Sequence, residues 1–285
     1  ERRIVLEQGS TAINGPHQGA WVDTKTGEHW FIHFQDRGAY GRIVHLQPMK
    51  WINDWPVIGT DKDADQKGEP VLSYKKPNVG AVYPVHTPVD SDEFNSGKLG
   101  LQWQWHANNQ PWWAFPAQGS LRLFSVLAPD SAKNLWTVPN LLMQKFPAEE
   151  FTATVKFDFR PALEEEMMGL VVMGYDYAHV SLTKKGNGLL LSWSVCKEAD
   201  KGNVEKTEVV ADMKGSDMYF RVQVRKGGIC TFSTSFDGKT FNPIGDPFTA
   251  QPGRWIGAKL GLFCLRKVKT NDAGFVDVDW FRVDQ

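Results

Sequence analysis

Residues 15–51 read GPHQGAWVDTKTGEHWFIHFQDRGAYGRIVHLQPMKW, and this stretch decides the fold of the N-terminal part of the chain. Residues 24–28 carry turn chemistry, with Gly27 inside the turn, between the aromatic-rich segments 20–22 and 29–34. A turn of this composition between two such segments predicts an antiparallel hairpin. A further arm, residues 41–51, follows a short connection that contains glycine. We therefore expect one β unit over this stretch.

Length and charge limit what the rest of the chain can be. Its 285 residues suffice for one large domain or two of ordinary size, and we expect two. With 32 basic and 33 acidic side chains the net charge is -1, which gives no electrostatic footprint for nucleic acid or an anionic membrane. No apolar run approaches the roughly 18 residues that a membrane span needs. We expect a soluble protein with neutral or small partners, no nucleic acid and no membrane span.

Three cysteines, Cys196, Cys230 and Cys264, cannot all pair with one another, and none lies in a Cys-x-x-Cys arrangement. This spacing indicates neither a disulfide framework nor a thiolate zinc site. We predict three buried thiols.

The chain opens on Glu1-Arg2-Arg3 and reaches the strand-like Ile4-Val5-Leu6 at once, with no initiator Met and no signal region. We expect a piece of a longer protein that is secreted or periplasmic, with the cytoplasm as the alternative location.

Strand signals dominate the remainder of the sequence. Apolar and polar side chains alternate over residues 151–159 and again over residues 218–225, as they do in half-buried strands. Asp237-Gly238 is a hairpin turn signal. Short strands separated by turns over roughly 190 residues predict two packed antiparallel sheets. The polar, proline-containing residues 61–90 are expected to form an extended connector, with the domain boundary near residue 88.

Two sets of motifs resemble a known family, glycoside hydrolase family 43, which contains β-xylosidases and α-L-arabinofuranosidases. The first set resembles the closing part of that family's catalytic five-bladed β-propeller: Pro16-His17-Gln18-Gly19, Val22-Asp23-Thr24, Gly27-Glu28, Trp30-Phe31-Ile32-His33, Gly41-Arg42 and Lys50-Trp51. The second set resembles the concanavalin-like β-sandwich appended to it: residues 91–94, 101–105, 169–170, 175–178, 261–262 and 278–283. The resemblance spans nearly the whole chain.

The fold class that the resemblance implies is all-β, with the C-terminal portion of a five-bladed β-propeller followed by an antiparallel β-sandwich, a concanavalin-like jelly roll. Residues 1–75 are expected to be the last blades of the propeller, residues 76–88 a linker, and residues 89–285 the sandwich. Blades are four-stranded sheets, so residues 1–75 hold only about one and a half of them. The propeller is therefore expected to be incomplete.

The activity that the resemblance implies is inverting, exo-acting hydrolysis that releases terminal arabinofuranose or xylose from plant polysaccharide-derived oligosaccharides. In that chemistry one carboxylic acid protonates the leaving oxygen while a second activates water on the opposite face of the sugar. The family's catalytic carboxylates lie upstream of its His-Gly step, so we expect no catalytic residue in this chain. The expected partners are an arabinose- or xylose-containing oligosaccharide and the N-terminal propeller portion of the same protein.

Two residues carry the family's site onto this chain. The resemblance implies that His17 holds calcium or another cation at the propeller centre and that Arg42 binds substrate. The residues alone equally allow a hydrogen-bonded turn histidine and a solvated strand arginine. No organic cofactor is expected. At the position where some members place a sandwich Phe at the rim of the pocket, this chain has Lys259, so the expected rim contact is in question.

Carboxylates in the sandwich suggest a second metal hypothesis. Asp92 and Glu93 lie on the expected first strand, and Asp277 and Asp279 lie on the last. Carboxylate oxygens suit calcium, so a structural calcium bound by Asp279 and these neighbours is a hypothesis. The run Glu164-Glu165-Glu166 is expected to be a solvated charge run in a connection.

The tryptophans leave an alternative function open, a non-catalytic carbohydrate-binding β-sandwich protein. Aromatic faces stack on sugars, and the candidates are Trp103, Trp105, Trp112 and Trp113. Tryptophans in sandwiches also pack in cores, and burial of each stabilises by a few kcal/mol. A third alternative is a purely structural module that braces a neighbouring domain.

Overall fold

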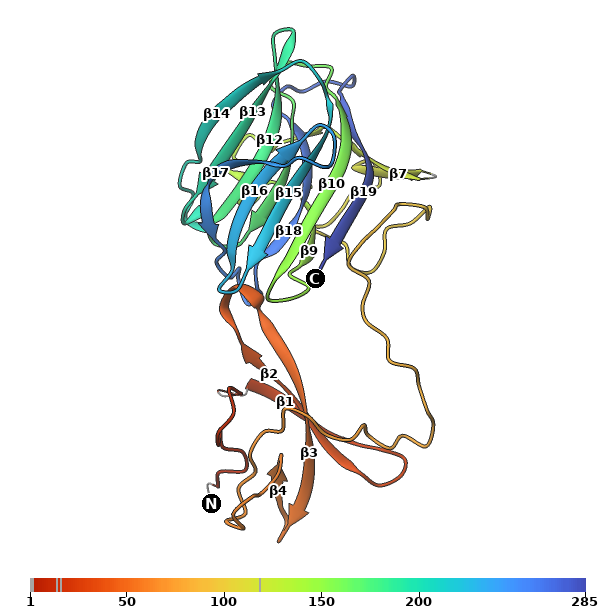
Figure 1. Cartoon of the computed structure of the whole chain (residues 1–285), viewed down its shortest axis with the longest axis vertical. Helices are drawn as coiled ribbons and strands as arrows, with labels where there is room; N and C mark the ends of the chain where they lie inside the picture. The colour runs from red at the N-terminus through yellow and green to blue at the C-terminus, as the bar shows by residue number, and fades with distance from the viewer. Residues whose placement is uncertain (1–2, 14, 16, 118) are drawn as a thin grey trace. The chain divides into compact units, whose positions relative to one another are not determined.

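The computed structural model describes residues 3–13, 15, 17–117 and 119–285, and the side chains of residues 17 and 117 lie outside that description. The chain divides into two compact units, Glu1–Arg37 with Arg42–Thr87 and Gly38–Gly41 with Pro88–Gln285. Both units are built from β-strands, shown in Figure 1, and the described residues also form three short 3-10 helices: η1 (Gly38–Tyr40), η2 (Leu135–Thr137) and η3 (Ala199–Lys201). Within the described ranges, no helix has the length and apolar character to cross a membrane.

The first unit is a four-stranded antiparallel sheet in the order β1-β2-β3-β4. Its strands are β1 (His17–Asp23), β2 (His29–Asp36), β3 (Arg42–Ile52) and β4 (Trp55–Ile58). The turn between β1 and β2 is closed by Thr24, whose N–H donates to the Glu28 carbonyl at 2.9 Å. Gly27 adopts a φ of 84°, which favours glycine. The predicted hairpin is confirmed.

Part of the expected connector belongs to this sheet unit, which corrects the prediction for residues 61–70. The N–H of Thr60 donates to the Glu69 carbonyl at 2.9 Å, and the reverse bond measures 3.0 Å. The chain returns so closely that a Cβ on Gly68 would lie 1.6 Å from the Ile58 carbonyl oxygen. This close backbone approach requires glycine at position 68, and it folds the polar segment back onto β4.

The second unit is a sandwich of two sheets. The seven-stranded sheet has the order β17-β16-β15-β10-β19-β7-β6, and the eight-stranded sheet has the order β14-β13-β12-β11-β18-β9-β5, with β8 pairing parallel to β18. The strands are β5 (Gln104–Trp105), β6 (Ala114–Ala117), β7 (Ser120–Phe124), β8 (Val126–Leu127), β9 (Leu142–Lys145), β10 (Phe151–Arg160), β11 (Met167–Met173), β12 (Tyr177–Lys185), β13 (Gly188–Cys196), β14 (Lys206–Met213), β15 (Asp217–Arg225), β16 (Ile229–Ser235), β17 (Asn242–Thr249), β18 (Lys259–Arg266) and β19 (Phe275–Asp284).

The predicted alternation in β10 and β15 builds the sandwich core. Val155 pairs with Phe220 on one side and with Phe281 on the other, so apolar side chains of three strands share one face. Phe157 and Phe220 are fully buried with ring centroids 4.7 Å apart. Full burial of one such side chain stabilises by about 2 kcal/mol. The expected all-β class with an antiparallel β-sandwich is confirmed.

The three cysteines are free and buried, as predicted. Burial raises the pKa of all three thiols, and that of Cys230 reaches about 12. Thiols with raised pKa remain protonated and unreactive at neutral pH.

The tip between β2 and β3, Gly38–Gly41, packs within the second unit. The Ala258 N–H donates to the Ala39 carbonyl at 2.7 Å, and the Gly228 N–H donates to the Tyr40 hydroxyl at 2.9 Å. A Cβ on Gly257 would lie 2.5 Å from the Gly41 nitrogen, so this contact requires glycine there. Four residues of the sheet connection thus complete the sandwich unit.

Glu166 contradicts the expectation of a solvated run, because its side chain is fully buried. Its carboxylate accepts hydrogen bonds from the backbone N–H groups of Ala162 at 2.6 Å, Leu163 at 3.0 Å and Gly274 at 2.8 Å. A buried carboxylate needs such donors to replace water. Glu164 and Glu165 are exposed, as expected.

Replacing Glu166 with Gln should lower the free energy of unfolding by about 2 kcal/mol, because the amide removes the charge and turns a donor toward backbone donors. Chemical denaturation measures this loss. Glu164→Gln, at an exposed position of the same run, is the matched control and should change stability by less than about 0.5 kcal/mol. Equal stability of the Glu166→Gln protein and the wild type would show that the buried carboxylate is dispensable.

Candidate functional site

Arg42 opens β3 and pairs across the sheet with Asp36, the last residue of β2. Its guanidinium carbon lies 4.6 Å from the centroid of the Phe34 ring, which supports the side chain by a cation–π contact. The residue is exposed, and within the described part of the chain no hydrogen bond or ion pair engages its guanidinium. The planar fork is therefore held on one face while its donors stay open to a ligand.

His17 is the first residue of β1, and its backbone lies opposite Phe34. A register shift follows between His17 and Ala20, where Gln18 has a φ of 38°. The imidazole of His17 lies outside the described side chains, so its role as a cation ligand stays a prediction. The sheet register does bring the backbones of His17 and Arg42 to the same end of the sheet.

A row of buried polar side chains on one face of this sheet was not predicted. Gln35 donates to the Ala12 carbonyl at 3.0 Å, and Gln47 accepts from the Val71 N–H at 2.8 Å. His33, only 2% exposed, lies beside His45 with ring centroids 5.2 Å apart. The signal was present in the sequence, because His-x-Gln occurs at 33–35 and again at 45–47.

Both histidines of this row are short of hydrogen bonds. Among the described residues, three ring nitrogens have no hydrogen-bond partner: Nδ1 and Nε2 of His33 and Nε2 of His45. Burial lowers the pKa of both imidazoles, and the charges of His33 and Arg37 lower that of His45 further. These imidazoles are therefore neutral at pH 7.

His33 also lines a cavity of about 400 Å³ together with residues 3–6, 18–19, 31 and 58.

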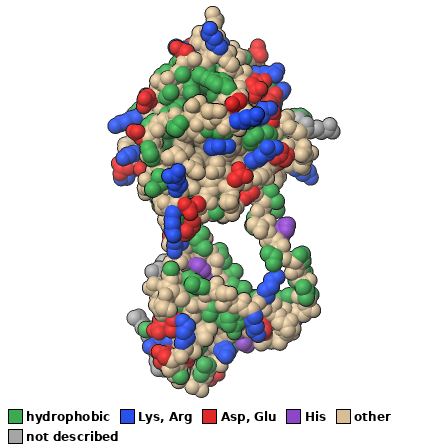
Figure 2. Space-filling view, viewed as in Figure 1, with side chains coloured by type: hydrophobic (Ala, Val, Ile, Leu, Met, Phe, Trp, Pro, Cys, Tyr) green, Lys and Arg blue, Asp and Glu red, His purple; other side chains and the backbone are tan. Residues whose placement is uncertain are grey.

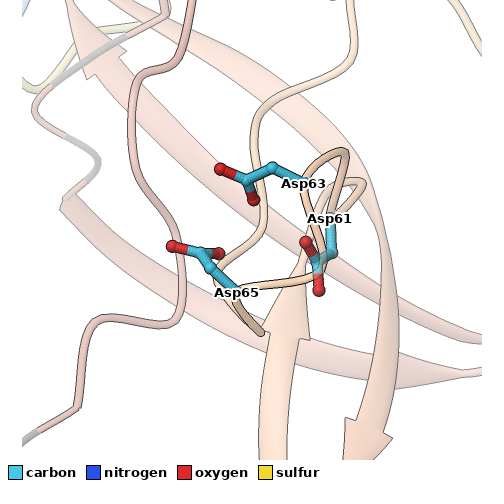
Figure 3. A group of neighbouring side chains, drawn as sticks. All are labelled: Asp61, Asp63 and Asp65. Carbon is cyan, nitrogen blue, oxygen red and sulfur yellow. The ribbon is translucent and has the colours of Figure 1, made fainter.

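An acidic turn at Asp61, Asp63 and Asp65 was also missed, although its Asp-x-Asp-x-Asp spacing is visible in the sequence. One carboxylate oxygen of each lies within 4.8 Å of the others. Figure 3 draws the three side chains on their turn. The turn uses much of this charge itself. Asp61 accepts from the Gln66 N–H at 2.9 Å, and Asp65 pairs with the Lys67 side chain, which lowers the pKa of its carboxyl.

Each of the four sandwich carboxylates has a protein partner in the described part of the chain, and calcium at Asp279 stays a prediction. Asp279 pairs with Lys156 at 2.5 Å. The other three carboxylates also have partners: Asp277 with Arg122 at 2.7 and 2.8 Å, Glu93 with Arg282 at 2.7 and 3.0 Å, and Asp92 with the Phe94 N–H and the Trp103 indole at 2.8 and 2.9 Å. Figure 2 shows basic and acidic side chains interspersed over the sandwich. The first and last segments do meet, since Asp92 and Phe281 exchange backbone hydrogen bonds of 2.7 and 2.8 Å, but the carboxylates there are occupied by donors.

Lys259 opens β18 directly opposite Lys145. Burial lowers the pKa of its ammonium, and the charge of Lys145 lowers it further. The side chain is half-buried, where an uncharged rim aromatic was the family expectation.

A further buried polar set lies on the eight-stranded sheet. The Tyr177 hydroxyl donates to Glu205 at 2.7 Å, and His179 Nε2 lies 3.0 Å from the same carboxylate oxygen. Burial opposes ionisation of Glu205, but attraction to His179 and these hydrogen bonds outweigh it and hold the pKa at about 2. The Leu135 N–H donates to the Tyr177 hydroxyl at 3.0 Å, so the set fastens η2 to the sheet.

Comparison with known proteins finds a family and several relatives that match this chain. The family model of the beta xylosidase C-terminal concanavalin A-like domain matches residues 91–284. A putative beta-xylosidase of Xylanibacter ruminicola is 37% identical over 272 residues, which cover 93% of this chain and 47% of that protein. A non-reducing end alpha-L-arabinofuranosidase of Bacteroides ovatus is 30% identical over 286 residues, which cover 91% of this chain and 49% of that protein.

Among solved structures, a bifunctional GH43-CE protein of Bacteroides eggerthii is similar, with a TM-score of 0.77 and 25% identity over 95% of this chain and 34% of that chain. The chain spans about half the length of the curated relatives it matches.

Acid should destabilise the chain through His33. Its pKa in the folded state lies below the ordinary value of 6.5, so below pH 6.5 the unfolded chain binds more protons than the folded one. The stabilisation is therefore complete above about pH 6.5 and is lost as the pH falls. Chemical denaturation between about pH 7.5 and pH 5 should show a smaller loss of stability for His33→Phe than for the wild type.

The control for this measurement is His86→Gln, at an exposed position, which should keep the wild-type dependence on pH. An unchanged dependence in the His33→Phe protein would mean that another group is responsible.

Proposed function

Because the chain belongs to the family of beta xylosidase C-terminal concanavalin A-like domains of glycoside hydrolase family 43, we propose that it is the C-terminal part of an inverting, exo-acting glycoside hydrolase. The enzyme releases terminal arabinofuranose or xylose from oligosaccharides derived from plant polysaccharide. Its catalytic carboxylates come from an N-terminal portion of the same protein. The names of the two curated relatives support both sugars.

The observation that carries this proposal is a sheet with exposed apolar side chains on both faces, one of which also bears the row of buried polar side chains. On one face Ile32 pairs with Leu46, and the two are 39% and 44% exposed. On the other face Trp21 and Trp51 pack edge to face, 53% and 43% exposed. A sheet buries its apolar faces against further layers, and propeller blades do so against neighbouring blades. Together with relatives about twice as long, this supports further blades beside β1–β4.

Arg42 has the chemistry to hold a sugar in such a site. Its guanidinium offers five N–H donors in a plane, suited to sugar hydroxyls and to a carboxylate beside them. The Phe34 ring beneath it limits its motion, so fewer conformations are lost on binding. We assign Arg42 to substrate binding and His17 to a cation at the propeller centre. Where calcium is bound there, it supplies a fixed positive charge.

In the complete protein, Arg42→Ala should lower kcat/KM for 4-nitrophenyl xyloside and arabinofuranoside about tenfold or more, a loss of about 1.4 kcal/mol of transition-state stabilisation. The matched control is Arg225→Ala, at an exposed strand arginine of the sandwich, which should retain wild-type kinetics. Unfolding midpoints of both variants should match the wild type. Wild-type rates in the Arg42→Ala enzyme would remove this residue from the site.

The stereochemistry of the product tests the mechanism itself. Because water attacks from the face opposite the leaving group, the sugar first released should carry the inverted anomeric configuration. Proton NMR of the sugar that the complete protein releases, recorded before mutarotation, identifies the anomer. A retained configuration excludes the inverting mechanism, and pentoside hydrolysis by residues 1–285 alone excludes the assignment of the carboxylates to another portion.

A further inference from the structure

A cavity of about 590 Å³ opens within the sandwich unit, at the loop that precedes β6. Its size falls in the range of small-molecule sites, roughly 300 to 1,000 Å³. Its lining comes from this loop, from the stretch that runs from β7 to β8, from the segment between η2 and β9, and from the end of β18: Gln110, Trp112, Trp113, Phe124, Ser125, Val126, Leu127, Pro139 and Arg266.

Trp112 differs from the core tryptophans in its exposure to solvent. Its side chain is 66% exposed, whereas Trp103 and Trp113 are 8% and 6% exposed. Trp103 packs between Phe94 and Phe281, so it is a core residue and not part of a sugar-binding face. An indole left open at the mouth of a cavity keeps a flat apolar face for a ligand.

Two uncommitted polar groups share the cavity wall. Within the described residues, neither the Gln110 side-chain amide nor the Trp113 indole N–H forms a hydrogen bond. Trp113 is held in place by an edge contact with Trp105, with ring centroids 5.3 Å apart. An amide that both donates and accepts, and an indole that donates, match the hydroxyl groups of a sugar.

Charge favours a neutral ligand. Arg266 carries the charge on this wall, and its guanidinium donates to the carbonyl oxygens of Val268 at 3.0 Å and Thr270 at 3.1 Å, and also to that of Ser125. Those bonds commit it to the protein backbone. Another cavity of the sandwich, of about 620 Å³, differs because Lys133, Glu205 and other charged side chains line it.

We propose that this cavity is a binding site for a neutral glycan, with one sugar ring stacked on Trp112 and its hydroxyls bonded to Gln110 and Trp113. Of the four tryptophans considered from the sequence, one is the stacking platform and one is part of the wall. The site belongs to the sandwich unit alone and needs no catalytic carboxylate. It therefore does not depend on the proposed hydrolase activity.

The test is binding of the 285-residue chain to xylohexaose, measured by isothermal titration calorimetry. Trp112→Ala should weaken binding about tenfold or more, because a stacking contact is lost. Trp112→Tyr, which keeps an aromatic face, should stay within about threefold of the wild type. Unfolding midpoints of both variants show whether the exposed position leaves the fold intact.

Two control variants isolate the site. Phe115 is 61% exposed on β6 and does not line the cavity, so Phe115→Ala should bind as the wild type does. Arg225→Ala, at an exposed arginine that does not line the cavity, should likewise leave this affinity unchanged.

Three results would overturn the proposal. They are equal affinity of the Trp112→Ala and wild-type chains, absence of binding to xylohexaose at millimolar concentration, and tighter binding of an acidic oligouronide than of xylohexaose. None of these results bears on pentoside hydrolysis by the complete protein, so this proposal and the proposed function fail independently.

Discussion

The structure depends on one constraint: each apolar face of a β-sheet must be covered by another layer. In the sandwich the two sheets meet this need for each other, and the side chains between them, such as Phe157 and Phe220, reach full burial. In β1–β4 the described residues meet it only in part, since Trp30 and Met49 are buried whereas Ile32, Leu46 and Trp21 remain exposed. The same physical rule thus explains a finished core in one unit and an open surface in the other.

The features that the sequence predicted are those that depend on neighbours along the chain. Alternation with a period of two identified β10 and β15, and the turn residues 24–28 identified the hairpin, because both patterns are local. Glu166 was missed because one of its donors, Gly274, lies 108 residues away. The engagement of Asp279 by Lys156, 123 residues away, is equally invisible in a one-dimensional pattern.

The candidate site shows the same division. Arg42 and His17 were named from short motifs, and strand register brings their backbones to one end of the sheet. The His33 and His45 pair needed that register to be recognised, because the two residues become neighbours only when β2 and β3 are aligned. The sequence does not show which of Trp112 and Trp113 is exposed. Adjacent residues point to different environments, and the sequence alone does not say which of the two environments faces solvent.

The tetrapeptide Gly38–Gly41 has a consequence for how the molecule can be divided. The chain passes between the two units three times, after residues 37, 41 and 87, so the units are interleaved in sequence. A fragment that starts at residue 88 lacks the Ala39 carbonyl that accepts from Ala258 and the Tyr40 hydroxyl that accepts from Gly228. Excision at a single point therefore removes both contacts, and an independently produced sandwich has to be supplied with the tip.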